Sequence, residues 1–371
     1  MTAATGTTVL KTALATYAHT KGLKDGTVTA PGIRLEHVEV SPIVGAFRRM
    51  VRALEFDVSE MAITTYLTAK AHGKAFTALP VFVMRQFHHA PIVYNVKSGV
   101  KSPKDLEGKK VGVRAYTVTT GVWARGILAT EYGVDLDKVT WVVVDEEHVQ
   151  EYQKPANVLE RPGANLGEML VKGELAAAIG AGQIDSPDVK PLIPNPREAE
   201  AAWYRKTGIY PINHTVVVKD SLLQADATLA PRLFAAFKEA KAIFLKQLGS
   251  AAQLSGDAQV LAQRRSIVGD DPLPNGVARN RKALEAVIQF ALDQKILPRK
   301  VDPEEMFARN TLDLGSASPV AYALRTPTHS PMFGGHEQRA RRQHGYRPSV
   351  ERSDLLSDPV RRRLHGGARR P

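Results

Sequence analysis

The sequence contains no cysteine. A disulfide framework, a cysteine nucleophile and a thiolate metal site are therefore excluded, so any chemistry falls to histidine, carboxylate, tyrosine, hydroxyl and arginine side chains. Long apolar runs are lacking as well, because even the stretch 234–248 carries three lysines and a glutamate. A membrane span needs about 18 uninterrupted apolar residues. We therefore expect no membrane-spanning segment and no membrane partner.

The N-terminus lacks the pattern of a secretory signal peptide, which is a basic segment followed by an apolar one. Hydrophobic alternation begins already at Val9. The sequence therefore predicts a cytoplasmic protein.

Positive charge is spread unevenly along the 371 residues, whose formal net charge is +12. The segment 316–371 holds 11 arginines and four acids, and therefore +7 of that excess. It is rich in Arg, Pro, Gly and His and has no helical or strand period, which predicts a disordered basic tail. The rest of the excess is thinly spread, with no basic run interleaved with aromatic residues. We therefore expect no nucleic-acid partner.

Before position 220 the chain alternates short apolar strands with amphipathic helices, and afterwards it is helical. Strands are predicted at 9–17, 33–40, 56–61, 76–84, 91–96, 111–115, 139–144, 176–179 and 215–218. Helices are predicted near 41–54, 64–72, 119–132, 166–172, 198–206, 231–248, 251–268 and 276–294. Such alternation favours an α/β fold with mostly parallel sheets, and the length favours two of them. We expect two lobes with a cleft between them.

Polar side chains that follow strands are the candidates for a site, because ligands of open α/β sheets bind at the carboxyl ends of strands. The candidates are Tyr17 and His19; Thr64, Thr65 and Tyr66, with Glu60 before them; Arg85, His88 and His89; Tyr116, Thr119 and Thr120; and Tyr210 and His214. The threonines begin predicted helices, where free backbone N–H groups bind anions.

Three candidates, Arg85, His88 and His89, lie together at the end of a predicted strand. Arg85 is the best anion binder, because its planar guanidinium pairs bidentately with a carboxylate. His88 and His89 are adjacent on a strand and point to opposite faces, so one of them is expected to enter a site.

The structural alternatives stay open at this stage. The segment 17–26 also fits a surface turn, Thr64 a helix cap and His214 a satisfied core histidine. The acidic group 145–148 fits a solvated face or, as an alternative, a carboxylate-rich metal site. No GxGxxG, P-loop, HExxH or GxSxG pattern stands between a predicted strand and helix, so nucleotide binding and the corresponding hydrolases have no support.

Four stretches in this order carry a family resemblance: FDVSEMAITTYL, VFVMRQFHHAPIVYN, TGIYPINHTVVVKDSLL and GDDPLPNGVARNRKALEAVIQFALDQKIL. As a set they resemble the 4,5-dihydroxyphthalate decarboxylase family, whose members look like relatives of type 2 periplasmic solute-binding proteins. The resemblance covers about 9–314. It implies a two-lobe architecture in which 8–93 and 215–315 form lobe 1 and 94–214 form lobe 2, each lobe a mostly parallel sheet flanked by helices.

The resemblance also implies an activity, the non-oxidative decarboxylation of 4,5-dihydroxyphthalate, or of a related hydroxylated aromatic acid, in the interlobe cleft. The products would be 3,4-dihydroxybenzoate and carbon dioxide, and no organic cofactor is needed. Arg85 would bind the substrate carboxylates, His89 or His214 would deliver a proton to the ring, and Tyr17 or His19 would polarise the phenol. The remaining expected substrate-binding residues are Thr64, Thr65, Tyr66, Tyr116, Thr119, Thr120 and Tyr210.

Two alternatives to this hypothesis remain. The chain can be an intracellular solute-binding protein that binds a small aromatic or carboxylate ligand without catalysis. A divalent metal ion, held by His19, His89 or His214 with Glu60, can instead assist decarboxylation. The partner expected in every case is a small aromatic carboxylate, and the oligomeric state is left open.

Overall fold

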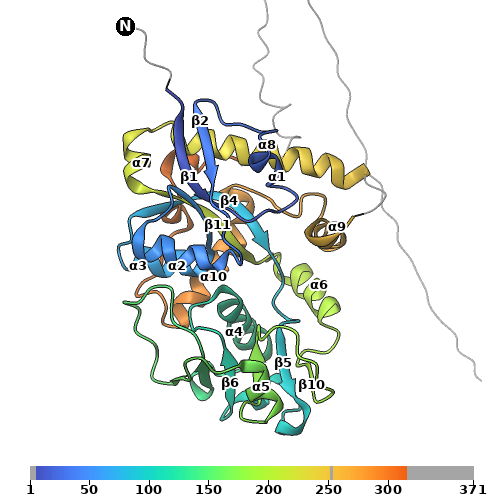
Figure 1. Cartoon of the computed structure of the whole chain (residues 1–371). Coiled ribbons are helices and arrows are strands. Elements are labelled where there is room, and N and C mark those ends of the chain that lie inside the picture. The colour runs from blue at the N-terminus through green and yellow to red at the C-terminus, as the bar shows by residue number, and fades with distance from the viewer. Residues whose placement is uncertain (1–5, 251–253, 316–371) are drawn as a thin grey trace, which may run out of the picture. The chain divides into compact units, whose positions relative to one another are not determined.

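The computed structural model describes residues 6–250 and 254–315 (Figure 1). The expected basic tail at 316–371 lies outside the described residues. Within them the chain forms two mixed sheets flanked by helices, which confirms the α/β fold predicted from the strand and helix alternation. In the described part of the chain, no helix has both the length and the apolar character to cross a membrane.

The first sheet has five strands in the order β2-β1-β3-β11-β4. Strands β1, β2 and β3 pair in parallel, whereas β11 is antiparallel to both of its neighbours, β3 and β4. One strand therefore runs against the other four. The strands are β1 (Thr8–Ala13), β2 (Ile33–His37), β3 (Val58–Ala62), β4 (Phe76–Arg85) and β11 (Ile212–Lys219).

The second sheet has six strands in the order β10-β5-β9-β6-β7-β8. Here β5 is the strand that runs against the others, being antiparallel to both β9 and β10. Two strands, β8 and β10, were not predicted, because two of the three residues in each are exposed and no apolar strand pattern marks them. The strands are β5 (Ile92–Asn95), β6 (Lys110–Val113), β7 (Thr140–Val143), β8 (Val158–Glu160), β9 (Ala177–Ile179) and β10 (Val189–Pro191).

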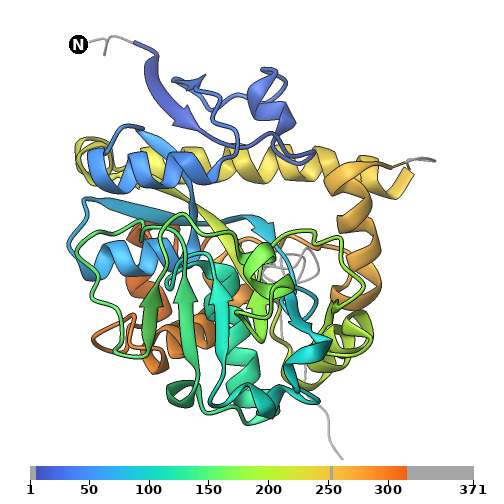
Figure 2. The same ribbon diagram turned by 60° about the horizontal axis from the view of Figure 1, so that its bottom comes forward.

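The helices cover both sheets, and Figure 2 brings the strands of the second sheet to the front. The α-helices are α1 (Lys21–Lys24), α2 (Val44–Ala53), α3 (Ile63–Ala71), α4 (Thr119–Tyr132), α5 (Leu166–Val171), α6 (Pro196–Thr207), α7 (Asp220–Ala225), α8 (Leu229–Ser250), α9 (Gly256–Val268) and α10 (Val277–Asp293). Short 3-10 turns occur at Val96–Ser98, Pro103–Leu106, Leu136–Lys138, Pro303–Met306 and Arg309–Thr311.

The chain passes between the sheets twice. In each sheet, the strand that runs antiparallel to its neighbours is the one that follows a crossing. Strand β4 of the first sheet leads through 86–91 into β5 of the second, and the chain returns after α6 through 208–211 into β11. The lobe boundaries at 93/94 and 214/215 stay a prediction.

Apolar side chains from both sheets share one core. Trp123 of α4 and Trp141 of β7 are fully buried in it, together with Phe47 of α2. Helix α10 packs closely on α4, because Gly126 faces the ring of Phe290 without space for a β-carbon. The core therefore fixes the starts of α2 and α4 relative to the sheet edges where the strands end.

Candidate functional site

A pocket of about 140 Å³ lies where central strands of both sheets end and three helices begin. Larger hollows of about 930 and 500 Å³ lie elsewhere. The smaller pocket is the candidate site because strand ends and helix N-termini converge on it. Its lining residues are Val44, Phe47, Ala62, Thr65, Arg114, Val118, Thr119, Thr120, His148, Ile179, Gly180, Asn213 and His214.

His214 is the pocket residue best placed for acid–base chemistry. It pairs with Ala62 across β11 and β3, which puts Glu60 diagonally beside it on the same face of the sheet. The His214 Nδ1 lies 2.6 Å from the Glu60 Oε1. An ionised carboxylate only accepts hydrogen bonds, so Nδ1 carries the hydrogen and donates it to Glu60. The Nε2 atom of His214 is therefore left for a ligand.

Glu60 is fully buried and has three hydrogen-bond donors. Besides His214, the Tyr17 hydroxyl donates to it at 2.6 Å and the Ala15 N–H at 2.9 Å. Burial pushes the pKa of Glu60 upward, but these bonds and the charge of His214 outweigh it and hold the pKa below its ordinary value. Glu60 is therefore a charged group that orients His214 and stabilises its protonated form.

Tyr17 and His19 stand behind Glu60. Burial and the neighbouring Glu60 raise the pKa of Tyr17 far above its ordinary value, so Tyr17 remains a hydrogen-bond donor. The His19 ring stacks on Tyr17 at 5.2 Å, and neither ring nitrogen has a partner among the described residues. Burial lowers the pKa of His19 to about 4. Neither residue lines the pocket.

The opposite side of the pocket is built to hold an anion. Arg114 directly follows β6, and its guanidinium Nη1 lies 2.8 Å from the Asp145 Oδ2. Its side chain is still 37% exposed, so donors remain for a ligand. The same Asp145 oxygen also accepts from Arg48 of α2 at 2.6 Å, which joins a helix beside the first sheet to a loop of the second.

Helices α3 and α4 point their N-termini into the same space. Their N-cap residues are Ala62 and Val118, neither of which caps the helix with a side chain. The positive end of each helix dipole and its first N–H groups therefore favour a negatively charged ligand. The Thr64 hydroxyl donates to the Thr117 carbonyl at 2.6 Å and lies 2.8 Å from the Thr119 Oγ1, so it ties the two helix starts together.

His148 adds a second imidazole to the pocket wall. Its Nδ1 lies 2.9 Å from the Thr65 Oγ1, and its buried Nε2 has no partner within the described ranges. Burial lowers the pKa of His148 to about 3, so this ring is neutral at physiological pH. The pocket therefore offers one carboxylate-backed histidine and one neutral histidine.

The structure thus brings together His214, Thr65, Thr119 and Thr120 as pocket-lining residues. Thr64 contacts Thr119 directly, and Tyr17 is linked to His214 through Glu60.

Arg85 and Tyr210 are placed elsewhere, which corrects the expected carboxylate clamp. Arg85 ends β4, the edge strand of the first sheet, and is in register with Ile212 of β11, but its side chain bonds the return crossing and α10. There the Arg85 guanidinium donates to the Asn280 side chain at 2.5 Å and to the Tyr210 carbonyl, and its carbon lies 4.4 Å from the Tyr210 ring centre.

Neither His88 nor His89 lines the pocket. His89 is fully buried against Trp203, with ring centres 5.5 Å apart, so the structure does not place it as a proton donor. The His88 Nε2 lies 3.2 Å from the Asn213 Oδ1, and Asn213 is a pocket residue. His88 therefore supports the pocket wall from behind.

Tyr66 and Tyr116 are core residues, which corrects their expected role in substrate binding. The Tyr66 hydroxyl donates to the Met306 carbonyl and accepts from the Ala78 N–H at 3.2 Å. The Tyr116 ring lies 4.1 Å from the guanidinium carbon of Arg125. Both rings are nearly inaccessible to solvent, so neither reaches a ligand in the pocket.

Sequence reasoning missed Arg114 and Phe47 and set His148 aside as part of an acidic group. Arg114 was hidden because the strand was expected to end at position 115, whereas β6 ends at Val113. With the true boundary, the rule that ligands bind at strand ends identifies it. Phe47, whose ring lies edge-on to His214 at 5.0 Å, gave no signal beyond the apolar face of a helix.

The alternative set of metal ligands is not brought together. Among residues 6–250 and 254–315, no group of three or more His, Asp or Glu side chains is arranged to hold a metal ion. His214 and Glu60 touch each other, but His89 packs against Trp203 instead of joining them.

Comparisons with known proteins agree with the resemblance. Residues 47–156 match a family model described as NMT1/THI5 like. The 4,5-dihydroxyphthalate decarboxylase of Comamonas testosteroni is 28% identical over 322 residues, which cover 82% of this chain and 97% of that protein. The enzyme of the same name from Pseudomonas putida is 31% identical over 210 residues, covering 53% of this chain and 81% of that one.

Solved structures give more distant matches. The alkanesulfonate-binding protein of Xanthomonas axonopodis pv. citri is 14% identical, with a TM-score of 0.49, and the match covers 82% of this chain and 99% of that one. The periplasmic aliphatic sulphonate-binding protein of Escherichia coli is also 14% identical, with a TM-score of 0.49 and coverage of 87% and 98%. On the strength of its curated relatives, this chain belongs to the 4,5-dihydroxyphthalate decarboxylase family.

Proposed function

We propose that the protein removes a carboxyl group from a hydroxylated aromatic acid in the pocket between the two sheets. The first substrate to test is 4,5-dihydroxyphthalate, with 3,4-dihydroxybenzoate and carbon dioxide as products, because the curated relatives carry the name of that activity. The observation that supports this proposal most strongly is the Glu60–His214 pair, which leaves one imidazole nitrogen to a pocket that also contains Arg114.

The pair can supply the proton that the reaction needs. Protonated His214 donates a proton from Nε2 to the ring carbon that bears the departing carboxylate, and the hydroxyl para to it stabilises the dienone-like intermediate. The bond to the carboxylate then breaks, its electron pair restores the aromatic ring, and carbon dioxide leaves. General acid catalysis of this kind typically contributes about a hundredfold to ten-thousandfold. Glu60 stabilises the imidazolium before the transfer.

The pocket suits a ligand with one ring and negative charge. Its volume of about 140 Å³ is close to that of an engineered cavity of about 150 Å³ that binds benzene. Arg114 and the N-termini of α3 and α4 would hold the carboxylates. The Phe47 ring would form an apolar wall.

A solute-binding protein without catalysis is the second candidate, because an arginine with two helix N-termini also serves simple anion binding. The Glu60–His214 pair favours the enzyme, since binding an anion does not need a buried carboxylate behind a histidine. Independence from organic cofactors and the cytoplasmic location remain predictions.

The test mixes purified protein with 4,5-dihydroxyphthalate and follows 3,4-dihydroxybenzoate by liquid chromatography, with and without a chelator. We expect product in both arms. Saturable binding without product would favour the solute-binding alternative, and product that disappears with the chelator and returns with a divalent ion would favour the metal-assisted route. Absence of both binding and product would refute the proposed substrate class.

A further inference from the structure

A second hollow of about 500 Å³ lies beside the end of β4 and the return crossing at 208–211. We call it the crossing pocket, defined by Arg85, Tyr204, Tyr210, Val268, Asp271 and Lys282 together with neighbouring residues of α10. None of its lining residues lines the pocket that contains His214. The two hollows are therefore separate.

Arg85 is a buried cation without a counter-ion. It is 5% exposed, and in the described part of the chain no carboxylate lies within ion-pair distance of it. Its hydrogen-bond acceptors are neutral: the Asn280 side chain and the carbonyls of Tyr210 and Pro211. A guanidinium has five N–H groups, so two remain after these three bonds.

Such an arrangement is costly for the folded protein, because a buried charge is normally paired. Burial lowers the pKa of Arg85 to about 10, which still leaves it charged at physiological pH. An anion in the crossing pocket would supply the missing counter-charge.

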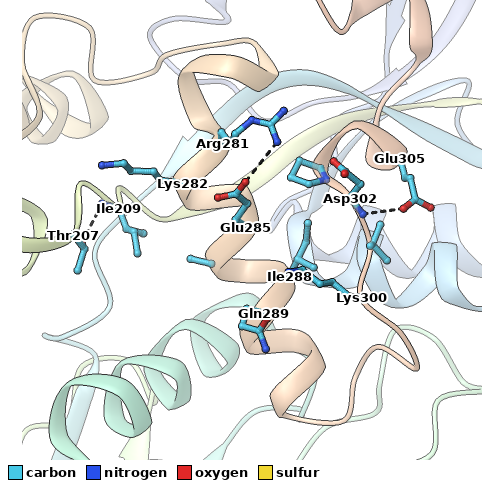
Figure 3. A pocket seen from close by; sticks show the side chains of 13 residues that line it. Thr207, Ile209, Arg281, Lys282, Glu285, Ile288, Gln289, Lys300, Asp302 and Glu305 are labelled. Carbon is cyan, nitrogen blue, oxygen red and sulfur yellow. Dashed lines mark hydrogen bonds and ion pairs between the residues drawn. The ribbon is translucent and has the colours of Figure 1, made fainter.

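Lys282 is a second cation available at this pocket. Lys282 also lines the hollow of about 930 Å³ that Figure 3 draws, where its side chain points toward the segment of Thr207 and Ile209 and away from Glu285. Its Nζ lies 3.0 Å from where a β-carbon on Gly208 would stand. Neighbouring charges are already paired: Arg281 with Glu285 at 3.5 Å, and Asp271 with both Lys241 at 2.9 Å and Arg279 at 3.0 Å.

The other walls of the crossing pocket indicate what kind of anion fits. Tyr204, Tyr210, Val268 and Pro274 present rings and apolar atoms, and the volume is within the usual range for small organic ligands. A bare inorganic ion would leave these walls without contacts. We propose that the crossing pocket is a second binding site, for a small organic acid whose carboxylate is held by Arg85 and Lys282 and whose body contacts the apolar walls of the pocket.

The test uses para-fluorobenzoate as the probe and follows its binding to the intact protein by fluorine NMR. An Arg114→Gln background weakens binding at the first pocket, so that the remaining signal reports the crossing pocket. We expect saturable binding in this background. Adding Lys282→Gln should weaken it about tenfold or more, because a charged hydrogen bond is lost. The matched control is Lys300→Gln, which removes the same charge beyond the far side of α10 and should leave the affinity unchanged (Figure 3).

Three results would overturn the proposal: no saturable binding in the Arg114→Gln background, equal affinity with and without Lys282, or equal weakening by Lys300→Gln. Inorganic phosphate provides a separate arm. It should displace the probe only at much higher concentration, and displacement at equal concentration would refute an organic acid as the ligand class. Arg85→Lys keeps the charge but loses the forked guanidinium group, so this variant should also bind the probe more weakly. Circular dichroism checks that it folds.

Discussion

At the scale of single residues, the site depends on the buried negative charge of Glu60. Glu60 is fully buried, and two of its donors, the Ala15 N–H and the Tyr17 hydroxyl, come from one loop, whereas the third, His214, is far away in the sequence. Its function is to position His214, which is the residue expected to touch the substrate.

Glu60→Gln should therefore lower kcat about a hundredfold or more with little change in KM, since the amide keeps the shape but no longer stabilises protonated His214. Steady-state kinetics measure this effect, with Glu36→Gln on the exposed face of β2 as the control. An unchanged kcat would contradict the role given to Glu60.

Arg114 should act on binding instead. Arg114→Lys keeps the charge but loses the bidentate fork, so KM should rise about tenfold while kcat stays close to wild type. Arg48→Lys is the matched control, because Arg48 shares the Asp145 partner but does not line the pocket. A fall in kcat at constant KM would show that Arg114 does not hold the substrate in its ground state.

At the scale of elements, the sequence predicts which segments are strands and helices but not the order of strands in a sheet. The hydrophobic pattern placed β4 closely, whereas it predicted only 215–218 of β11 and left His214 outside the strand. Arg85 and His214 were both expected in one site, as carboxylate binder and proton donor. In the observed sheet His214 is in register with Ala62 of β3 and lines the pocket, whereas the side chain of Arg85, on the edge strand β4, bonds Asn280 and the Tyr210 carbonyl. Sheet order depends on long-range pairing that local patterns do not contain.

The contact between α4 and α10 is an element-scale feature that can be tested by stability. An alanine at position 126 would place its β-carbon within the Phe290 ring, and one of the helices must move to accommodate it. Gly126→Ala should therefore destabilise the fold by about 1–3 kcal/mol, the usual cost of overpacking, despite its better helix propensity. Urea unfolding measures the change in the free energy of unfolding. Gly6→Ala is the control, because an added β-carbon there meets no neighbour within 4 Å. A stabilised Gly126→Ala variant would contradict the close packing.

At the scale of the whole molecule, buried histidines couple stability to pH. Burial lowers the pKa of His88 and His148 to about 3 and that of His19 and His89 to about 4. In the unfolded chain the same side chains bind protons below about pH 6.5. Between these values the unfolded state binds more protons, so the free energy of unfolding falls as the pH falls.

This stabilisation should be fully present above about pH 6.5 and should decrease by up to about 1.4 kcal/mol per pH unit for each histidine below it. The midpoint of urea unfolding, measured at several pH values between 8 and 5, gives the dependence of stability on pH. His89→Phe removes one of the four groups and should make the slope shallower, although it also changes packing against Trp203. A midpoint that stays constant down to pH 5 would contradict the burial of these rings in neutral form.

The central claim is that His214, held by Glu60, gives a proton to an aromatic ring bound beside Arg114. The most direct measurement compares wild type with His214→Asn for two quantities, the rate of 3,4-dihydroxybenzoate formation from 4,5-dihydroxyphthalate and the affinity for that substrate by calorimetry. The account predicts a rate lower by about a hundredfold to ten-thousandfold with affinity close to wild type. Product formation at the wild-type rate in the His214→Asn variant would contradict it.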